Sequence, residues 1–136
     1  MPQLSPEQRA ALAWIKTNTN AADSFLVFDE QGNPLLSPFV EWFPALSERH
    51  SLTTIQGTEW LGGDRHYNQQ LPVITSVRAC LYQDVECIYR LSDKIKANYI
   101  VVSAQSHVPL LFSLESHPDF ELAYSSATVK VYKGTK

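Results

Sequence analysis

A chain of 136 residues, of which 44% are hydrophobic and 18% charged, is long enough to form one globular domain with its own core. No metal or dense set of disulfides is therefore needed for folding. The net charge of −3 at pH 7 offers no basic surface for a phosphate backbone, so no nucleic-acid partner is expected.

The sequence pattern also bears on membrane insertion. No apolar run reaches the roughly 20 residues that a transmembrane helix needs. The first residues lack the basic and apolar regions of a signal peptide. We therefore expect residues 1–136 to be a single soluble domain with no transmembrane segment of its own.

The N-terminal part predicts a capped helix and then a buried strand. Ser5 can act as the N-cap, Pro6 suits the first helical position, and Gln8 can complete a capping box. The helix should end within residues 17–20, whose side chains compete for backbone hydrogen bonds. Residues 24–28 are apolar and rich in β-formers, which predicts a buried strand.

The middle of the chain predicts short elements between long loops. After a loop over residues 29–37, residues 39–46 could form a short helix that Pro44 interrupts. Residues 51–55 are a second strand candidate. Residues 57–70, with their glycine pair, predict a long polar loop.

The C-terminal half predicts a helical region, a strand, a helix and a hairpin. Apolar residues recur at helical spacing within 72–96, which favours one bent helix or two helices broken near the cysteines. Residues 99–103 form the clearest strand pattern, and residues 109–115 favour a short helix. Residues 120–124 and 128–132 alternate as half-buried strands do.

Strands that alternate with helices predict an α/β domain with a mixed sheet in two or three layers. The strands at 24–28, 51–55 and 99–103 should lie parallel, because helical connections join them. The terminal hairpin should add antiparallel strands. Helices should flank this sheet.

The two cysteines, Cys80 and Cys87, leave three alternatives open. In one unbroken helix they would lie two turns, about 10 Å, apart, which is too far for a disulfide. If the chain turns at residues 82–84, they could form a disulfide. Otherwise they are two buried thiols or, with no Cys-x-x-Cys motif to support it, a reactive or metal-binding pair.

Two Glu-Trp dipeptides in the central loops are the main candidates for a binding surface. Aromatic rings suit the apolar faces of sugars, and nearby carboxylates can accept hydrogen bonds from hydroxyl groups. The alternative is that both tryptophans pin long loops to the sheet. The candidate ligand-binding residues are Glu41, Trp42, Arg49, Glu59, Trp60, Asp64, His66 and Tyr67.

No residue is assigned a catalytic or metal-binding role. His66 with Asp64, near His50 and Glu59, is the only dense polar group with acid–base potential, and no helical histidine pair accompanies it. No cofactor is expected, because no phosphate-binding glycine motif occurs.

Other polar residues lie near the predicted C-terminal strands. Ser103 and Ser106 follow a strand, where open α/β sheets bind ligands, but they lack a nucleophile-elbow motif. His107 and His117 flank the helix predicted at 109–115 and are expected at the surface.

Several stretches resemble the segments that follow the last transmembrane helices of polytopic bacterial membrane proteins. These stretches are residues 14–27, 41–49, 56–60, 99–103, 114–120 and 129–133. The family includes glycosyltransferase-like proteins of the GT-C type and oligosaccharyltransferase-like proteins. Asn20 stands where proline is usual in that family.

The resemblance implies a non-catalytic C-terminal domain on the extracytoplasmic face of a cell membrane, as part of a larger membrane protein. The catalytic carboxylates of that family lie in the transmembrane part, so no catalytic residue is carried over. The implied partners are a carbohydrate or polyprenyl-linked sugar and the transmembrane portion of the same protein. An oxidising compartment would also favour a disulfide between Cys80 and Cys87.

Two other functions stay open at this point. The first is a protein-interaction domain of an envelope membrane protein, with Trp42 and Trp60 as interface anchors. The second is a small soluble enzyme that uses His66 with Asp64 or Glu59.

Overall fold

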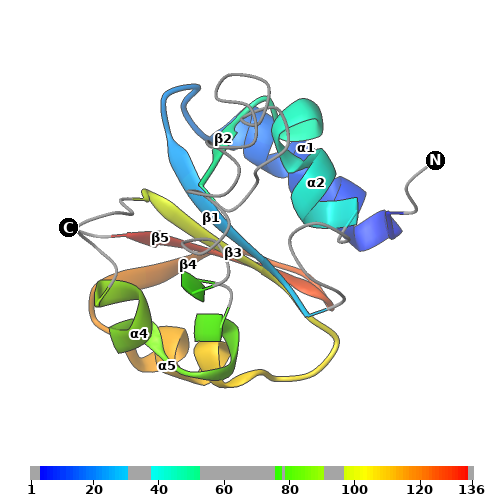
Figure 1. Ribbon diagram of the computed structural model, residues 1–136. Coiled ribbons are helices and arrows are strands. Elements are labelled where there is room, and N and C mark those ends of the chain that lie inside the picture. Colours follow the sequence, from blue (N-terminus) through cyan, green and yellow to red (C-terminus); the bar gives the residue numbers. More distant parts are fainter. Residues whose placement is uncertain (1–3, 31–37, 53–75, 78, 91–96, 135–136) are drawn as a thin grey trace, which may run out of the picture.

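The computed structural model describes residues 4–30, 38–52, 76–77, 79–90 and 97–134, which form a mixed sheet between two layers of helices (Figure 1). The elements are α1 (Pro6–Asn18), β1 (Ser24–Asp29), α2 (Pro38–Ser47), β2 (His50–Ser51), the 3₁₀ turn η1 (Cys80–Tyr82), α4 (Val85–Tyr89), β3 (Tyr99–Ser103), α5 (Pro109–Ser116), β4 (Phe120–Ser125) and β5 (Val129–Gly134). The predicted loop at residues 57–70 lies outside the described residues. None of the described helices is long and apolar enough to cross a bilayer.

The sheet has the strand order β2-β1-β3-β5-β4. β1 pairs in parallel with β2 and with β3, and Phe25 lies opposite Tyr99 in the second pairing. β5 runs antiparallel to β3 and to β4, and the last two strands form a hairpin. The predicted α/β class, with parallel strands in the centre and an antiparallel hairpin, is confirmed.

Alternation along the central strands creates two separate cores. Leu26 and Phe28 of β1 pack with η1, α4 and α5, whereas Phe25 and Val27 pack with α1 and α2. β3 divides its residues in the same way and is buried along its whole length. Because both faces are covered, these strands read as continuous apolar runs rather than alternating ones. The domain therefore has three layers, with α1 and α2 on one face of the sheet and α4 and α5 on the other (Figure 1).

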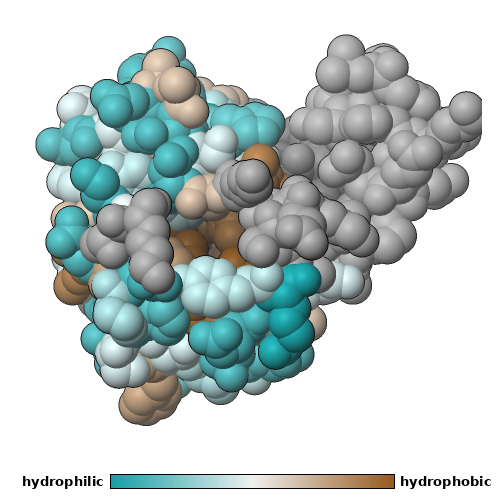
Figure 2. All heavy atoms as spheres, turned by 90° about the vertical axis from the view of Figure 1, so that its left-hand side faces the viewer, coloured by the Kyte–Doolittle hydropathy of each residue, from teal (hydrophilic) through white to brown (hydrophobic). Residues whose placement is uncertain are grey.

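Figure 2 shows the side of the molecule where β5 ends. Most of the described surface seen there is hydrophilic, and apolar residues are visible near its centre and in small patches elsewhere.

α1 begins as the sequence predicts. The Ser5 hydroxyl accepts a hydrogen bond from the Gln8 N–H at 3.0 Å, and the Gln8 side chain accepts one from the Ser5 N–H at 3.0 Å. This reciprocal pair satisfies two N–H groups that a helix leaves without a partner at its start. The helix ends at Asn18, and the Thr19 hydroxyl donates to the Ile15 carbonyl at 2.6 Å.

The second strand begins one residue earlier than predicted. β2 begins at His50, one residue before the predicted start, and residues 53–55 lie outside the described part of the chain. Its register explains the earlier start, because Ser24 of β1 lies opposite His50.

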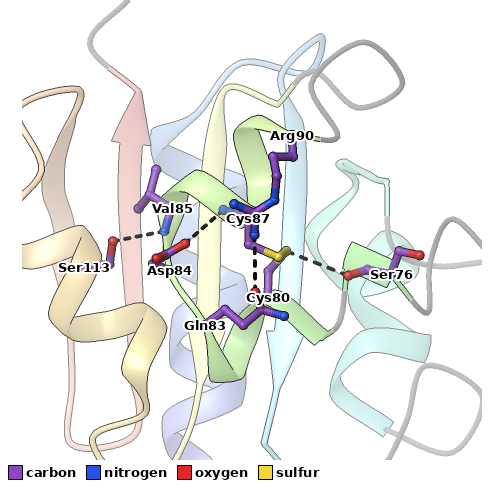
Figure 3. The surroundings of a disulfide bond; sticks show 8 residues. All are labelled: Ser76, Cys80, Gln83, Asp84, Val85, Cys87, Arg90 and Ser113. Carbon is purple, nitrogen blue, oxygen red and sulfur yellow. Dashed lines mark hydrogen bonds between the residues drawn. A yellow bond between two sulfur atoms is a disulfide. The ribbon is translucent and has the colours of Figure 1, made fainter.

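The predicted break near the cysteines is present, and the two cysteines form a disulfide (Figure 3). The chain turns after η1, and the Asp84 side chain caps α4 by accepting from the Cys87 N–H at 3.0 Å. This turn brings the Cα atoms of Cys80 and Cys87 to 5.5 Å, a normal separation for a disulfide. The Val85 N–H donates to the Ser113 hydroxyl at 2.9 Å, which links the bridged segment to α5.

Candidate functional site

The candidate ligand-binding residues fall into two groups. Trp42 lies on α2 and Arg49 follows that helix, so the structure describes both. The side chain of Glu41 and the residues Glu59, Trp60, Asp64, His66 and Tyr67 lie outside the described part, and their roles stay predictions. His50 is exposed at the start of β2. Because Glu59, Asp64 and His66 are not described, the convergence of His50 with them also stays a prediction.

α2 is amphipathic, and Trp42 lies on its exposed side. Phe39, Val40 and Phe43 are fully buried against β1 and α1. Trp42 and Leu46 lie one turn apart and keep 36% and 44% of their surface exposed. Large apolar side chains that stay exposed together mark a binding surface more often than scattered ones do.

An open groove lies between α1 and α2, which run beside each other on the same face of the sheet (Figure 1). Its volume is about 750 Å³, within the range of small-molecule sites. It is lined by Leu4, Arg9, Leu12, Ala13 and Lys16 from the α1 side and by Trp42 and Leu46 from α2. Of the sequence candidates with described side chains, only Trp42 lines it. The lining residues of α1 share one face of that helix, as the spacing of residues 9, 12, 13 and 16 shows, so the sequence contains this much of the signal.

Arg49 holds the end of α1 beside the end of α2. Its Nη2 donates to the carbonyl oxygens of Lys16 and Thr19, each at 2.8 Å, and its Nε donates to the Thr19 hydroxyl at 2.8 Å. Its Nη1 donates to the Glu48 carbonyl at 3.0 Å. The last carbonyls of a helix lack helical partners, and a cation there also suits the helix dipole. Arg49 thus positions the groove wall, and its predicted contact with a ligand stays a prediction.

The turn after α2 aims Arg49 at α1. Glu48 has a φ of 57°, the left-handed conformation that often ends a helix, and its N–H donates to the Pro44 carbonyl at 3.0 Å. Its carboxylate pairs with Lys16 across the two helices, and the hydrogen bond from the Lys16 ammonium lowers the pKa of Glu48. The Ser47 hydroxyl accepts from the Arg49 N–H at 3.2 Å. The side chains of Glu48 and Arg49, which follow α2, therefore attach this end of α2 to the end of α1.

The carboxyl ends of β1 and β3 form a second polar region. The loop after β1 leads to α2 on one face and the loop after β3 leads to α5 on the other, so this edge is where α/β sheets bind ligands. The Glu30 carboxylate accepts hydrogen bonds from the Ser106 hydroxyl and from the N–H groups of Gln105 and Ser106. The Ser103 hydroxyl accepts from the Gln8 side chain at 2.9 Å. The hydroxyl groups of both serines are thus hydrogen-bonded within the protein.

His117 belongs to a half-buried cluster, so it lies only partly at the surface, where it was expected. Its side chain is 18% exposed, and its ring lies edge-on to Tyr89 and Phe120. The Tyr89 hydroxyl donates to the Asp119 carboxylate at 2.6 Å. His117 is half-buried because Tyr89 of α4 and Phe120 of β4 lie against its ring, and local sequence does not reveal the contact with Tyr89, which is distant in the chain. His107 is exposed, as expected.

The Tyr89 hydrogen bond makes stability depend on alkaline pH. Burial, and then the Asp119 carboxylate, raise the pKa of Tyr89 well above its usual value. A raised pKa stabilises the fold below about pH 10, the unfolded value, and this contribution is lost as pH rises further. We expect Tyr89→Phe to lower the free energy of unfolding by about 1.5 kcal/mol at pH 7. Urea unfolding should show this deficit shrinking above pH ~10, and a constant deficit would contradict the assignment.

Comparisons with protein-family models, with curated proteins and with solved structures found no match to this chain. The fold and site therefore define the class: a three-layer α/β domain with a five-stranded mixed sheet in its described part and an apolar groove between α1 and α2.

Proposed function

We propose that this chain is a non-catalytic extracytoplasmic domain of a membrane glycosyltransferase-like protein, which helps to position an acceptor or a lipid-linked sugar. The observation that carries the proposal is the α1–α2 groove with Trp42 exposed in it. An exposed tryptophan beside apolar side chains can cover the apolar face of a sugar or a hydrocarbon chain.

One further observation supports this proposal. The disulfide between Cys80 and Cys87 is typical of oxidising compartments, which agrees with an extracytoplasmic location. The resemblance to membrane-protein domains supplies the context.

Calorimetric titration with a water-soluble farnesyl-phosphate-linked hexose, and with free hexoses, tests the proposal. We expect saturable binding of the linked sugar and at least a tenfold loss of affinity in Trp42→Ala, because the ring covers the ligand. Phe112→Ala is the matched control, since Phe112 is 63% exposed on α5, in the opposite helical layer. The proposal fails if neither ligand gives heat, or if both variants bind as the wild type does.

A protein-interaction domain is the second candidate. Trp42 and Leu46 lie at helical spacing beside a groove, an arrangement that also suits an amphipathic helix. The partner would be the transmembrane portion of the same protein or another envelope protein. A photo-crosslinker at residue 42 of the membrane-embedded protein discriminates the two functions, because it would join a protein segment here and a lipid-linked molecule in the first case.

A further inference from the structure

We propose that the α1–α2 groove binds the lipid-phosphate end of its ligand, a single-chain anionic amphiphile such as a prenyl phosphate. The hydrocarbon chain lies along Trp42 and Leu46, and the phosphate lies at Arg9. This inference rests on the proposed function and assigns which part of a lipid-linked sugar the groove takes.

The lining chemistry favours a hydrocarbon chain over a sugar. Apart from Arg9 and Lys16, the described lining residues are apolar: Leu4, Leu12, Ala13, Trp42 and Leu46. None of these described residues carries a carboxylate, amide or hydroxyl side chain to pair with sugar hydroxyls. A sugar here would leave polar groups without partners, which is costly, whereas a hydrocarbon chain loses only contact with water.

The two cations of the groove differ in their availability. The Lys16 ammonium is paired with the Glu48 carboxylate. Arg9 is exposed on α1, and no ion pair joins it to any carboxylate whose position the structure describes. Lys16 lies seven residues further along, so the two charges are about 10 Å apart along the helix axis. Arginine binds phosphate through a planar set of donors, so Arg9 is the site for the anionic group.

Charge and shape both favour a single molecule over a bilayer. The groove combines an available cation with apolar walls, which complements an anion that carries a hydrocarbon chain. The chain as a whole carries a net charge of −3, which weakens attraction to an anionic membrane surface. The exposed parts of Trp42 and Leu46 line a hollow between two helices. A single hydrocarbon chain in this hollow would contact both walls.

The experiment compares four probes by calorimetry: farnesyl phosphate, farnesol, inorganic phosphate and vesicles of anionic phospholipid. The two prenyl compounds are used below the concentrations at which they aggregate. We expect farnesyl phosphate to bind at least tenfold more tightly than farnesol, and inorganic phosphate alone to give no measurable binding. Arg9→Gln should reduce the affinity for farnesyl phosphate to that for farnesol and leave farnesol binding unchanged. Arg90→Gln, an exposed change on the α4 side of the sheet, is the matched control and should bind as the wild type does.

Several outcomes would overturn the inference. Equal affinity for farnesol and farnesyl phosphate would remove the role of charge, and an unchanged Arg9→Gln would remove the role of that residue. Binding to vesicles without binding to monomeric farnesyl phosphate would replace the single ligand with a membrane surface. Binding of free hexose, lost in Trp42→Ala, without binding of farnesyl phosphate would overturn the inference but leave the proposed function standing. If no probe binds, and the linked hexose does not bind either, both fall.

Discussion

Replacing Phe25 with alanine is expected to destabilise the domain by about 4 kcal/mol, the largest effect among these predictions. Phe25 is completely buried, and its ring stacks on Tyr99 at a centroid distance of 4.8 Å. It also contacts Phe43 of α2 at 5.4 Å. The substitution removes the transfer free energy of the ring and leaves a cavity that a rigid sheet cannot close.

The loss should also reach the groove, because Phe43 lies on the buried face of the helix that carries Trp42. Urea unfolding measures the change, and calorimetry with farnesyl phosphate measures the effect on the groove. Leu122→Ala is the control, since Leu122 is 51% exposed on β4 and should change stability by no more than about 0.5 kcal/mol. A loss below about 1.5 kcal/mol in Phe25→Ala would show that Phe25 is not a central core residue.

Removing the disulfide by the double change Cys80→Ala and Cys87→Ala is expected to cost about 2.5 kcal/mol, the second-largest effect. The two cysteines are seven residues apart, so the bond closes a short loop and restricts the unfolded chain only moderately. Both residues are buried in the core between the sheet and α5, so alanine also removes some packing.

Thermal or urea unfolding of the wild type with and without reductant isolates the contribution of the bond. The reduced wild type and the double variant should lose stability by similar amounts. Farnesyl phosphate should bind both as it binds the oxidised protein, because the disulfide and the groove lie on opposite faces of the sheet. If reductant leaves the unfolding transition unchanged, the bond is not present in solution.

The candidate site was only partly predictable from sequence. A large aromatic residue beside polar and turn-forming residues is unusual and indicates a binding surface, and Trp42 does line the groove. Arg9 and Lys16 did not stand out, because an exposed cation on a helix is ordinary until a second helix lies beside it. The predicted contact of Arg49 with a ligand stays a prediction, and its four hydrogen bonds, most of which join the ends of α1 and α2, could not be predicted from spacing.

Local signals in the sequence determined the elements themselves. The Ser5 capping box begins α1, the apolar runs form β1 and β3, and the alternating residues near the C-terminus form the β4–β5 hairpin. Each signal acts over a few residues, through backbone hydrogen bonding or the burial of one face. It therefore predicts its element without information about the rest of the chain.

Only the tertiary structure decided how those elements combine. The domain has three layers rather than two, because β1 and β3 carry apolar side chains on both faces and each face is buried against helices. Cys80 meets Cys87 because the chain turns at the N-cap of α4. The groove lies where α1 and α2 pack on one core, with Arg49 joining their ends. These outcomes depend on contacts between residues distant in sequence, and spacing along one element predicts which face is apolar but not what will lie against it.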